Sequence, residues 1–442
     1  MEQITLKQML LEDFSQERVA LVEDMHPADV AEILIEVPLE NQIRFIDTLP
    51  NDLAAMILQE MELNNEAEIL SHLAPEKTAK ILNQMYTDEA ADLLAELPET
   101  EAWALIALMG DKGKKVKKLL AYESDTSGGL MATEFIAVYE NQTLEQVLVL
   151  LREKAPSTES AYYIYVVSQE QRLVGVVSLR TLVTKPLETV VGDVMEQDVI
   201  SAPVDLDQEE VARLFDKYGF LVLPVVDQAQ RLLGVITVDD VLGVAEEEVT
   251  EDIHKAASIL PMKEAYIDAS IWTLFGKRII WLLGLILVNL VSSGVIAAYE
   301  DILSSVIALT FFIPLLIDTG GNTGSQSATM VVRALVTGDV KMADWGKVLI
   351  KELLVGIFLG LVLGFAGVFL GTARGGTEVG LVVGLTMVAI VIFSNIIGMA
   401  LPFILTKMRL DPAVASSPLI TSICDATGLL IYFAIATRVF KF

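Results

Sequence analysis

The apolar positions of the first hundred residues recur in pairs, one pair every 12 residues. These pairs are Ile33-Leu34, Phe45-Ile46, Ile57-Leu58, Ile69-Leu70, Ile81-Leu82, Leu93-Leu94 and Leu105-Ile106. Proline and acidic residues between the pairs, as in Ala74-Pro75-Glu76, are typical of helix starts. The repeat predicts short helices of about three turns that stack as a superhelix. We assign residues 1–130 to this acidic all-α N-domain.

After residue 133 the pattern changes to short Val- and Ile-rich runs between helical stretches, and this pattern occurs twice. The first copy contains Tyr162–Val167 and Gly175–Ser178, with a helix opening near Leu179. The second copy contains Leu221–Asp227 and Gly234–Thr237, again followed by a helical stretch. Each copy therefore predicts a strand, a turn, a strand and a helix.

This order of elements resembles a tandem pair of CBS domains, which we place at residues 131–195 and 196–250. CBS pairs are regulatory modules that bind nucleotides or ions, and the fold alone does not choose the ligand. In the members that bind adenine nucleotides, an Asp three residues after the Ser or Thr of the turn contacts ribose. The second copy has Asp240 there, whereas the first has Thr181. The resemblance makes ATP a candidate ligand, with Arg180 and Asp240 as its contacts.

The rest of the chain contains apolar stretches that are long enough to span a membrane. A hydrocarbon core of about 30 Å takes roughly 20 helical residues. Five stretches qualify, at about residues 279–299, 302–332, 353–373, 379–406 and 412–437. They predict a transmembrane pore domain at 276–442, preceded by an amphipathic connecting helix at 251–275. The predicted fold class is multi-domain: an all-α superhelical N-domain, an α/β tandem CBS pair, and an α-helical membrane domain with five transmembrane helices in the lipid bilayer.

Charges in the loops predict how the membrane domain is oriented. Lys277 and Arg278 precede the first span, and Glu300 and Asp301 follow it. By the positive-inside rule the N-terminal domains are cytosolic and the C-terminus is outside. The opening residues are not a basic stretch followed by a short apolar core, so we expect the first span to serve as targeting signal and anchor.

Charge composition separates the two halves of the chain and narrows the function. Residues 1–270 hold 51 acidic and 20 basic side chains, so the net charge of −29 belongs to the cytosolic part. One cysteine, Cys424, excludes a disulfide framework and a multi-cysteine zinc site. The sequence has no phosphate loop with its lysine, no HExxH motif and no nucleophile with an apparent histidine partner. We therefore predict neither an enzyme nor a nucleic-acid-binding protein.

Asp425 is the clearest candidate for chemistry inside the membrane. A carboxylate at the centre of a span costs from about 2.5 kcal/mol upward, so it usually faces a pathway or a partner. Asp425 lies midway along the fifth span, and the small residues Ala426–Gly428 that follow it let helices approach closely. No basic residue lies at a comparable depth. A protonated structural Asp is the alternative interpretation.

The second span combines a proline with repeated glycines in Ile313–Ser327. We expect these residues to interrupt the helix and free backbone carbonyls, so that the segment lines protein or water. Oxygen ligands of this kind suit Mg²⁺ or Ca²⁺ better than Zn²⁺ or Cu²⁺. The candidate pore ligands here are Asp318, Gly321, Asn322 and Thr323. One central carboxylate per chain is little charge for a divalent ion, so we expect a homodimer that brings two copies of Asp425 to one pore.

Taken together, these segments resemble the MgtE family of Mg²⁺ channels over essentially the whole length. The most specific pieces are Thr319–Thr329 (TGGNTGSQSAT), Val331–Leu335, Leu410–Ala413 and Asp425–Tyr432. The resemblance implies a Mg²⁺-selective channel or transporter for Mg²⁺ uptake across the bacterial plasma membrane. It also implies that Asp425 binds the permeating ion and that Asp411 lies near the cytosolic mouth. Ser325 and Ser417 stand where members of the family often have Asn.

The acidic cytosolic part is a candidate Mg²⁺ sensor. Asp88 and Asp92 are four residues apart on one predicted helix face, and they match ion-binding N-domain residues of the family. The resemblance implies further regulatory Mg²⁺ ligands at Asp240, Glu248, Glu251, Asp252, Asp207 and Glu209. Divalent ions between two acidic surfaces convert repulsion into bridging, so we expect cytosolic Mg²⁺ to close the pore. The alternatives are a carrier for Co²⁺, Mn²⁺ or Ca²⁺, and a membrane-anchored CBS nucleotide sensor.

Overall fold

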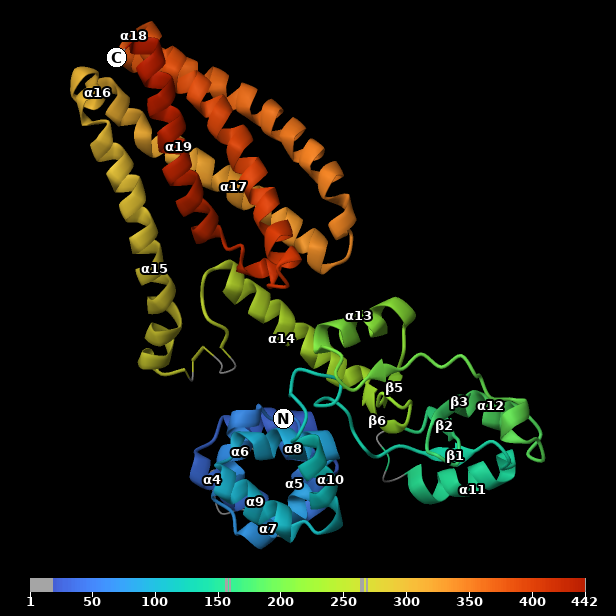
Figure 1. Cartoon of the computed structure of the whole chain (residues 1–442). Helices are drawn as coiled ribbons and strands as arrows, with labels where there is room; N and C mark the ends of the chain where they lie inside the picture. The colour runs from blue at the N-terminus through green and yellow to red at the C-terminus, as the bar shows by residue number, and fades with distance from the viewer. Residues whose placement is uncertain (1–18, 156–157, 159, 263–265, 268, 442) are drawn as a thin grey trace. The chain divides into compact units, whose positions relative to one another are not determined.

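The computed structural model describes residues 19–155, 158, 160–262, 266–267 and 269–441 (Figure 1). The chain forms two compact units, and the boundary between them falls between Glu246 and Glu247. The first unit contains short helices and two small sheets, and the second contains long apolar helices. Each unit has its own hydrophobic core.

Short helices wound about a common axis form the first part of the first unit (Figure 1). They are α2 (Val19–Glu23), α3 (Pro27–Ile35), α4 (Leu39–Thr48), α5 (Asn51–Leu58), α6 (Leu63–Ser71), α7 (Pro75–Leu82), α8 (Thr87–Glu96), α9 (Glu99–Leu108) and α10 (Asp111–Leu119). From α3 to α10, each helix packs on the second one along the chain, α3 on α5 and α4 on α6, for example. Every apolar pair of the 12-residue repeat is buried, so the predicted stacking of short helices is confirmed.

Two three-stranded sheets with one topology follow these helices. The first has β1 (Ala137–Tyr139), β2 (Tyr163–Val167) and β3 (Leu173–Ser178), and the second has β4 (Ala202–Pro203), β5 (Val222–Val226) and β6 (Leu232–Thr237). In each sheet the first strand is parallel to the second, which is antiparallel to the third. Helices α11 (Leu144–Lys154) and α13 (Gln208–Tyr218) follow the first strand of each sheet, and α12 (Leu179–Thr184) and α14 (Val238–Ala256) follow the third. The predicted strand–turn–strand–helix order is therefore confirmed in both copies.

The two sheets and the segment before them are joined through their backbones. Leu173 N donates to Gln230 O at 2.8 Å, which links the start of β3 in one copy to the β5–β6 turn of the other. Ala132 pairs with Val235 of β6. A Cβ on the neighbouring Gly234 would lie 2.6 Å from the Ala132 carbonyl oxygen, so strand β6 needs glycine at this position.

Helix α14 begins directly after β6 and runs without interruption to Ala256. The first residues of the segment that we predicted as a connecting helix are therefore the last turns of α14. Helix α15 (Ile271–Ala298) then opens the apolar part, with Ser270 as its N-cap. Residues 263–265 and 268 lie outside the described part of the chain.

The second unit continues with α16 (Glu300–Ser305), α17 (Ile313–Val336), α18 (Trp345–Lys407) and α19 (Ser417–Phe440). Among the described residues three helical segments are long and apolar enough to span a membrane, namely 271–298, 342–407 and 417–440. Helix α18 has two limbs, because Gly376 breaks its course with φ 83° and ψ 177°. Gly371 and Gly380 let the limbs touch, since a Cβ on Gly371 would lie 2.7 Å from Gly380 Cα.

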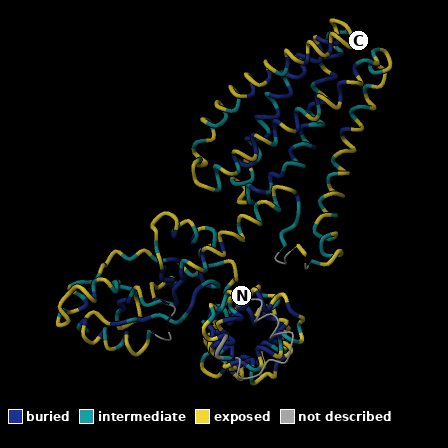
Figure 2. The backbone as a smooth tube through the Cα atoms, turned by 180° about the vertical axis from the view of Figure 1, so that it is seen from behind, coloured by how far each residue is buried: buried dark blue, intermediate teal, exposed yellow. Residues whose placement is uncertain are grey.

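Many positions on the outer faces of these helices are exposed (Figure 2), and large apolar side chains occupy a number of them. They include Ile280, Leu283 and Leu287 on α15, and Phe358, Phe365 and Phe369 on the first limb of α18, each more than half exposed. Small and apolar side chains fill the buried interior, where α17, α18 and α19 pack together. This arrangement suits a protein whose solvent is the bilayer.

The glycines of α17 do not break the helix, so that part of our prediction was wrong. Within the predicted second span, 302–332, the chain departs from the α-helix only before Pro314, namely at Val306 and in the 3₁₀ turn Ile307–Phe312. The glycines of α17 instead allow close packing. A Cβ on Gly321 would lie 2.7 Å from Thr421 Cγ2, and a Cβ on Gly398 of α18 would lie 2.2 Å from Gly324 O. A regular helix satisfies its backbone within the bilayer, and small residues then serve helix contact.

Candidate ion pathway and carboxylate sites

Asp425 and Asp318 approach each other from two packed helices of the membrane unit. Asp425 lies on α19 and is partly buried, and its Oδ1 accepts no hydrogen bond from any described residue. Asp318 lies on α17, close enough for the two carboxylates to repel each other electrostatically. The sequence named both Asp425 and Asp318 as candidate pore ligands, and the fold brings the two carboxylates near each other. A cation between them would remove the repulsion.

The other predicted ligands of α17 differ in how far their side chains are exposed. Asn322 is exposed and lies four residues after Asp318, so both side chains leave the same face of the helix. Thr323 is buried, and its hydroxyl donates to Thr319 O at 2.8 Å and to Gly320 O at 3.1 Å. Gly321 packs against Thr421. Asn322 is thus the one of these three whose side chain is both polar and accessible.

A cluster of charged side chains surrounds the end of α14 in the second unit. Lys255 Nζ lies 2.5 Å from Asp411 Oδ2 and also forms an ion pair with Glu251. Burial lowers the pKa of Lys255, but its hydrogen bonds to Asp411 and Glu251 outweigh this effect and raise the pKa above the usual value. Burial and the charge of Asp411 raise the pKa of Asp252. Three predicted ligands, Glu251, Asp252 and Asp411, are therefore neighbours.

A second group of carboxylates lies where α8 approaches the second CBS copy. Glu89 is partly buried, and its Oε2 accepts a hydrogen bond from Tyr86 N at 3.1 Å. Burial raises the pKa of Glu89 to about 7, and the nearby carboxylates of Asp240 and Asp239 add to the rise. Asp240 accepts hydrogen bonds from the amide and hydroxyl groups of Thr237, but burial still raises its pKa. Like charges from two domains therefore face each other here.

Hydrogen bonds to Glu134 and Thr133 hold the start of α8 at this place. Thr87, the first residue of α8, donates its hydroxyl to Glu134 Oε2 at 2.7 Å. The amide of Thr87 lies 3.3 Å from the same oxygen, and Thr133 N donates to Thr87 Oγ1 at 2.9 Å. A carboxylate at the N-terminus of a helix also interacts favourably with the helix dipole. The N-terminal helices are thus attached to the segment that enters the first CBS copy.

The predicted pair Asp88 and Asp92 lies on the same helix as Glu89. Asp88 is 5% exposed and Asp92 is exposed, so the two carboxylates have different surroundings although they are four residues apart. Glu66 of α6 is buried beside them. Burial raises the pKa of Glu66 well above its usual value, and the charges of Glu89 and Asp92 contribute. Lys112 interacts electrostatically with Glu134, Glu89 and Asp88.

The remaining predicted ligands have local roles in the structure. Asp207 caps α13 by accepting the amide of Glu209 at 2.9 Å. Glu209 forms an ion pair with Arg213 at 2.7 Å. Glu248 is partly buried on α14.

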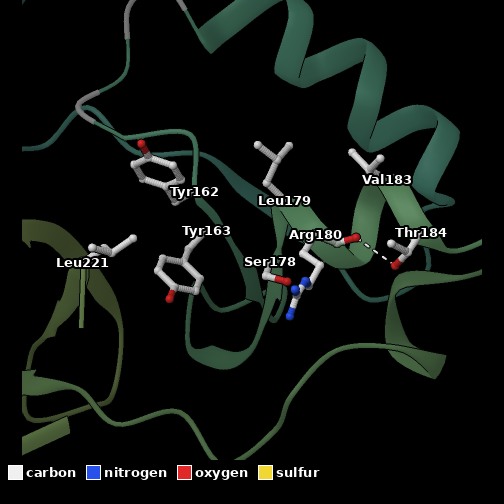
Figure 3. A pocket seen from close by; sticks show the side chains of 8 residues that line it. All are labelled: Tyr162, Tyr163, Ser178, Leu179, Arg180, Val183, Thr184 and Leu221. Carbon is white, nitrogen blue, oxygen red and sulfur yellow. Dashed lines mark hydrogen bonds between the residues drawn. The ribbon is translucent and has the colours of Figure 1, made fainter. Parts of the chain in front are cut away.

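The nucleotide contacts predicted from the CBS pattern do not meet in one place. A hollow of about 450 Å³ is lined by Tyr162, Tyr163, Ser178, Leu179, Arg180, Val183, Thr184 and Leu221 (Figure 3). Arg180 is exposed at this hollow, and the hydroxyl of Thr184 donates to its carbonyl oxygen at 2.8 Å. Asp240 is not among the lining residues and belongs to the other copy, where it bonds to Thr237. The hollow therefore combines aromatic rings with one guanidinium group.

Sequence reasoning missed several charged residues at these sites, among them Glu66, Glu89, Glu134 and Lys255. Glu89 and Lys255 have a local clue, since each lies within a few residues of a predicted ligand. Glu66 looks like any exposed acidic residue of the repeat until burial is known. Within the described ranges no three His, Cys, Asp or Glu side chains form a ready metal cage.

Comparison with known protein families covers both units. A model described as a divalent cation transporter matches residues 313–435, and one described as the MgtE intracellular N domain matches residues 25–125. A CBS domain model matches twice, at residues 128–188 and 191–247.

Three curated relatives share much of the length. The magnesium transporter MgtE of Thermus thermophilus is 44% identical over 322 residues, which are 73% of this chain and 72% of the relative. The magnesium transporter MgtE of Enterococcus faecalis is 35% identical, covering 75% of this chain and 73% of the relative. The magnesium transporter MgtE of Bacillus subtilis is 34% identical, covering 75% and 74%.

Two crystal structures resemble the first part of the chain. One is the soluble part of a magnesium transporter, with 33% identity and a TM-score of 0.53 over 56% of this chain and 98% of the other. The second is the cytosolic domain of the Mg²⁺ channel MgtE in complex with ATP. It has 38% identity and a TM-score of 0.53 over 55% of this chain and 99% of the other.

Proposed function

Because this chain belongs to the MgtE family of magnesium transporters, we propose that its acidic first unit senses cytosolic Mg²⁺ and closes the path that the membrane helices provide. The protein transports magnesium, it is not an enzyme, and its N-terminal soluble part is cytosolic. The proposal concerns how transport is controlled and which residues take part.

The observation that supports control by Mg²⁺ is the approach of Glu89 to Asp240 and Asp239. In the absence of a cation these carboxylates oppose the close arrangement of α8 and the second CBS copy. A hydrated divalent ion between them would attract the carboxylates of both domains and so replace their mutual repulsion. Binding would then favour the close arrangement in proportion to its differential affinity for that state. Low Mg²⁺ would leave the carboxylates bare and favour separation.

The other predicted regulatory ligands fit this mechanism in two groups. Asp88 and Asp92 lie on the same helix as Glu89, and Glu251 and Asp252 lie beside Asp411 in the second unit. We propose all of them as regulatory Mg²⁺ ligands, together with Glu248, Asp207 and Glu209. Helix α14 carries both Asp240 and Lys255. A helix without a break can transmit a displacement from the sensor to the residues next to Asp411.

For the ion path we propose that Asp425, Asp318 and Asn322 bind the permeating Mg²⁺ through its water shell. Gly321 and Thr323 would shape the path from α17, and Asp411 would lie at its cytosolic mouth. A homodimer would bring two copies of Asp425 and two of Asp318 to one pore, which is enough charge for a divalent ion. In this proposal each chain crosses the plasma membrane five times, and the two limbs of α18 supply two of these crossings. The C-terminus is then outside the membrane.

Mg²⁺ uptake into proteoliposomes that contain a Mg²⁺ dye tests the path. We expect uptake through the native chain at low Mg²⁺ on the cytosolic face, and its loss in Asp425→Asn. Asp301→Asn, which changes an exposed carboxylate outside the bundle, is the matched control and should keep uptake. Equal uptake through native protein and Asp425→Asn would remove Asp425 from the path.

Patch recordings test the control by internal Mg²⁺. The double change Asp88→Ala with Asp92→Ala should require more internal Mg²⁺ for inhibition than the native channel does. Glu96→Gln changes an exposed carboxylate at the end of the same helix and should leave inhibition unchanged. The proposal for these two ligands fails if the double variant is inhibited like the native channel.

A specific observation also favours ATP as a second ligand. The hollow in the first CBS copy offers Tyr162 and Tyr163 for stacking with a base and Arg180 for phosphate (Figure 3). We propose that ATP binds there. Titration of the purified chain with a fluorescent ATP analogue should show weaker binding in Arg180→Ala and native binding in Arg172→Ala, an exposed arginine on the β2–β3 turn. Asp240→Asn should not change this binding, because Asp240 does not line the hollow.

A further inference from the structure

A carboxylate that the ion path does not use lies at the start of the first limb of α18. Glu352 Oε2 accepts a hydrogen bond of 2.9 Å from the hydroxyl of Ser327 on α17. Glu352 is partly buried, and none of the ion pairs among the described residues involves it. A carboxylate held this way in a membrane unit usually marks a site for an ion or a proton.

Ser327 connects Glu352 to the second limb of α18. Its side chain is 4% exposed, and its Oγ lies 3.1 Å from the main-chain oxygen of Asn395 as well. A hydroxyl has one proton to donate, so it can serve only one of these two acceptors fully. If the proton points to Asn395 O, a lone pair of Ser327 becomes available on the side of Glu352.

Asn395 supplies a further oxygen at the same crossing. Its side chain is 2% exposed, and its Oδ1 is buried without a hydrogen bond from any residue in the described ranges. A buried polar atom in this state destabilises the fold unless a ligand or water satisfies it. The side chain lies against Gly356, where an added Cβ would be 3.5 Å from Asn395 Nδ2. Gly356 is four residues after Glu352, so both leave the same face of α18.

The set of donors at this crossing selects the kind of ligand. It comprises one carboxylate, a hydroxyl oxygen and an amide oxygen, all of them hard ligands. One negative charge in a site of low polarity is neutralised by one monovalent cation. Mg²⁺ would leave an excess positive charge there and would have to give up waters that it releases reluctantly. The donors therefore fit Na⁺ better than the transported ion.

We propose that Glu352, Ser327 and Asn395 form a Na⁺ site that ties α17 to both limbs of α18. Bound Na⁺ satisfies Asn395 Oδ1 and neutralises Glu352, while Ser327 turns its proton toward Asn395 O. The site is separate from Asp425, which lies on α19. Na⁺ binding there does not depend on Mg²⁺ transport. Its occupancy stabilises the glycine-packed part of α17, next to Gly324 and Gly398.

Equilibrium binding of ²²Na⁺ to the purified full chain tests this site, with choline replacing Na⁺ at constant ionic strength. The native chain should bind Na⁺ saturably, and Glu352→Gln should bind at least about tenfold more weakly, a change of about 1.4 kcal/mol. Glu378→Gln alters an exposed carboxylate near the break in the same helix and should bind as the native chain does. Asp425→Asn should also keep Na⁺ binding, which separates this site from the ion path.

A second variant and a second measurement cover the case in which Glu352→Gln does not fold. Ser327→Ala retains the carboxylate but removes one ligand, and it should also weaken Na⁺ binding. Its melting temperature should rise less with added Na⁺ than that of the native chain. Absence of saturable Na⁺ binding to the native chain would overturn the site. Displacement of Na⁺ by equal concentrations of Mg²⁺, or stabilisation by acid with no response to Na⁺, would show another occupant and overturn it as well.

Discussion

Lys255 Nζ lies 2.5 Å from Asp411 Oδ2 and fastens the end of helix α14 to the turn that precedes α19. Ser258 reinforces this attachment, because its hydroxyl donates to Ser416 Oγ at 2.6 Å. Helix α19 carries Asp425. The residue proposed to bind the permeating ion is thus on the helix that starts where α14 is attached. The ammonium group of Lys255 also supplies, from within the chain, a positive charge among carboxylates proposed to bind Mg²⁺.

Reversing this ion pair tests the attachment. Lys255→Glu places a further carboxylate beside Asp411, and we expect it to lower the melting temperature of the purified chain in EDTA. Asp411→Lys should do the same, and the double reversal should recover most of the loss. The side chains are 24% and 33% exposed, so we expect an effect on the order of 1 kcal/mol.

The matched control for this reversal is Lys347→Glu. Lys347 pairs with Asp344 at 2.7 Å, but its side chain is 85% exposed, and such surface pairs contribute little. Additive losses in the double reversal of Lys255 and Asp411 would mean that the two residues act independently.

Asp318 should contribute to Mg²⁺ uptake because its carboxylate faces Asp425. We expect Asp318→Asn to reduce uptake into proteoliposomes, since half of the negative charge of each chain at this point is removed. The loss should be smaller than that in Asp425→Asn, because Asp318 is exposed and Asp425 is partly buried. Uptake at the native rate would place Asp318 outside the path.

Protonation of Glu89 should make the first unit more stable in acid when Mg²⁺ is absent. Burial raises the pKa of Glu89 to about 7, above its ordinary value of 4.5. Between these two values the native chain binds a proton that the unfolded chain releases. The free energy of unfolding therefore falls as pH rises through this window, by on the order of 3 kcal/mol for this group.

Thermal unfolding in EDTA between about pH 5 and about pH 8 measures this effect. Glu89→Gln should flatten the pH dependence, whereas Glu96→Gln, at an exposed position of the same helix, should leave it unchanged. Saturating Mg²⁺ should also flatten it by neutralising the ionised group. A pH dependence that survives Glu89→Gln in full would assign it to other carboxylates.

Replacing Gly398 even with alanine should destabilise the membrane unit. An added Cβ would lie 2.2 Å from Gly324 O and 3.1 Å from Ser327 Cβ, so Gly398→Ala has to push α17 and α18 apart. Overpacking of this kind costs about 1–3 kcal/mol, which a lower melting temperature would reveal. Gly294→Ala on α15 is the control, because a Cβ there meets no atom within 4 Å. Equal melting temperatures for the two variants would contradict close packing at Gly398.

The sequence predicted those helices and strands that show a short-range pattern of apolar and polar residues. The 12-residue spacing of apolar pairs such as Ile57-Leu58 indicates buried positions, and the structure buries them. The alternation of strand and turn residues likewise gave both copies of the CBS pattern, with helices beginning at Leu179 and Val238. Local periodicity reports burial because each element presents one face to the core.

Glycine in α17 shows where a local pattern becomes ambiguous. Repeated glycine can break a helix or let it pack closely, and the sequence contains no information that separates the two. The structure decides for packing, because Thr421 and Gly398 lie directly against Gly321 and Gly324. The same residue type therefore has opposite structural meanings that depend on the neighbouring helix.

The sequence alone determined three features of this protein. They are the apolar stretches of the membrane domain, the excess of acidic residues among the first 270, and the presence of a carboxylate at Asp425. Only the tertiary structure decided which side chains meet. Lys255 and Asp411 are 156 positions apart, and Ser327 and Glu352 are 25 apart on different helices. Electrostatic and hydrogen-bond energies depend on distances of a few ångströms, and packing between distant segments sets those distances.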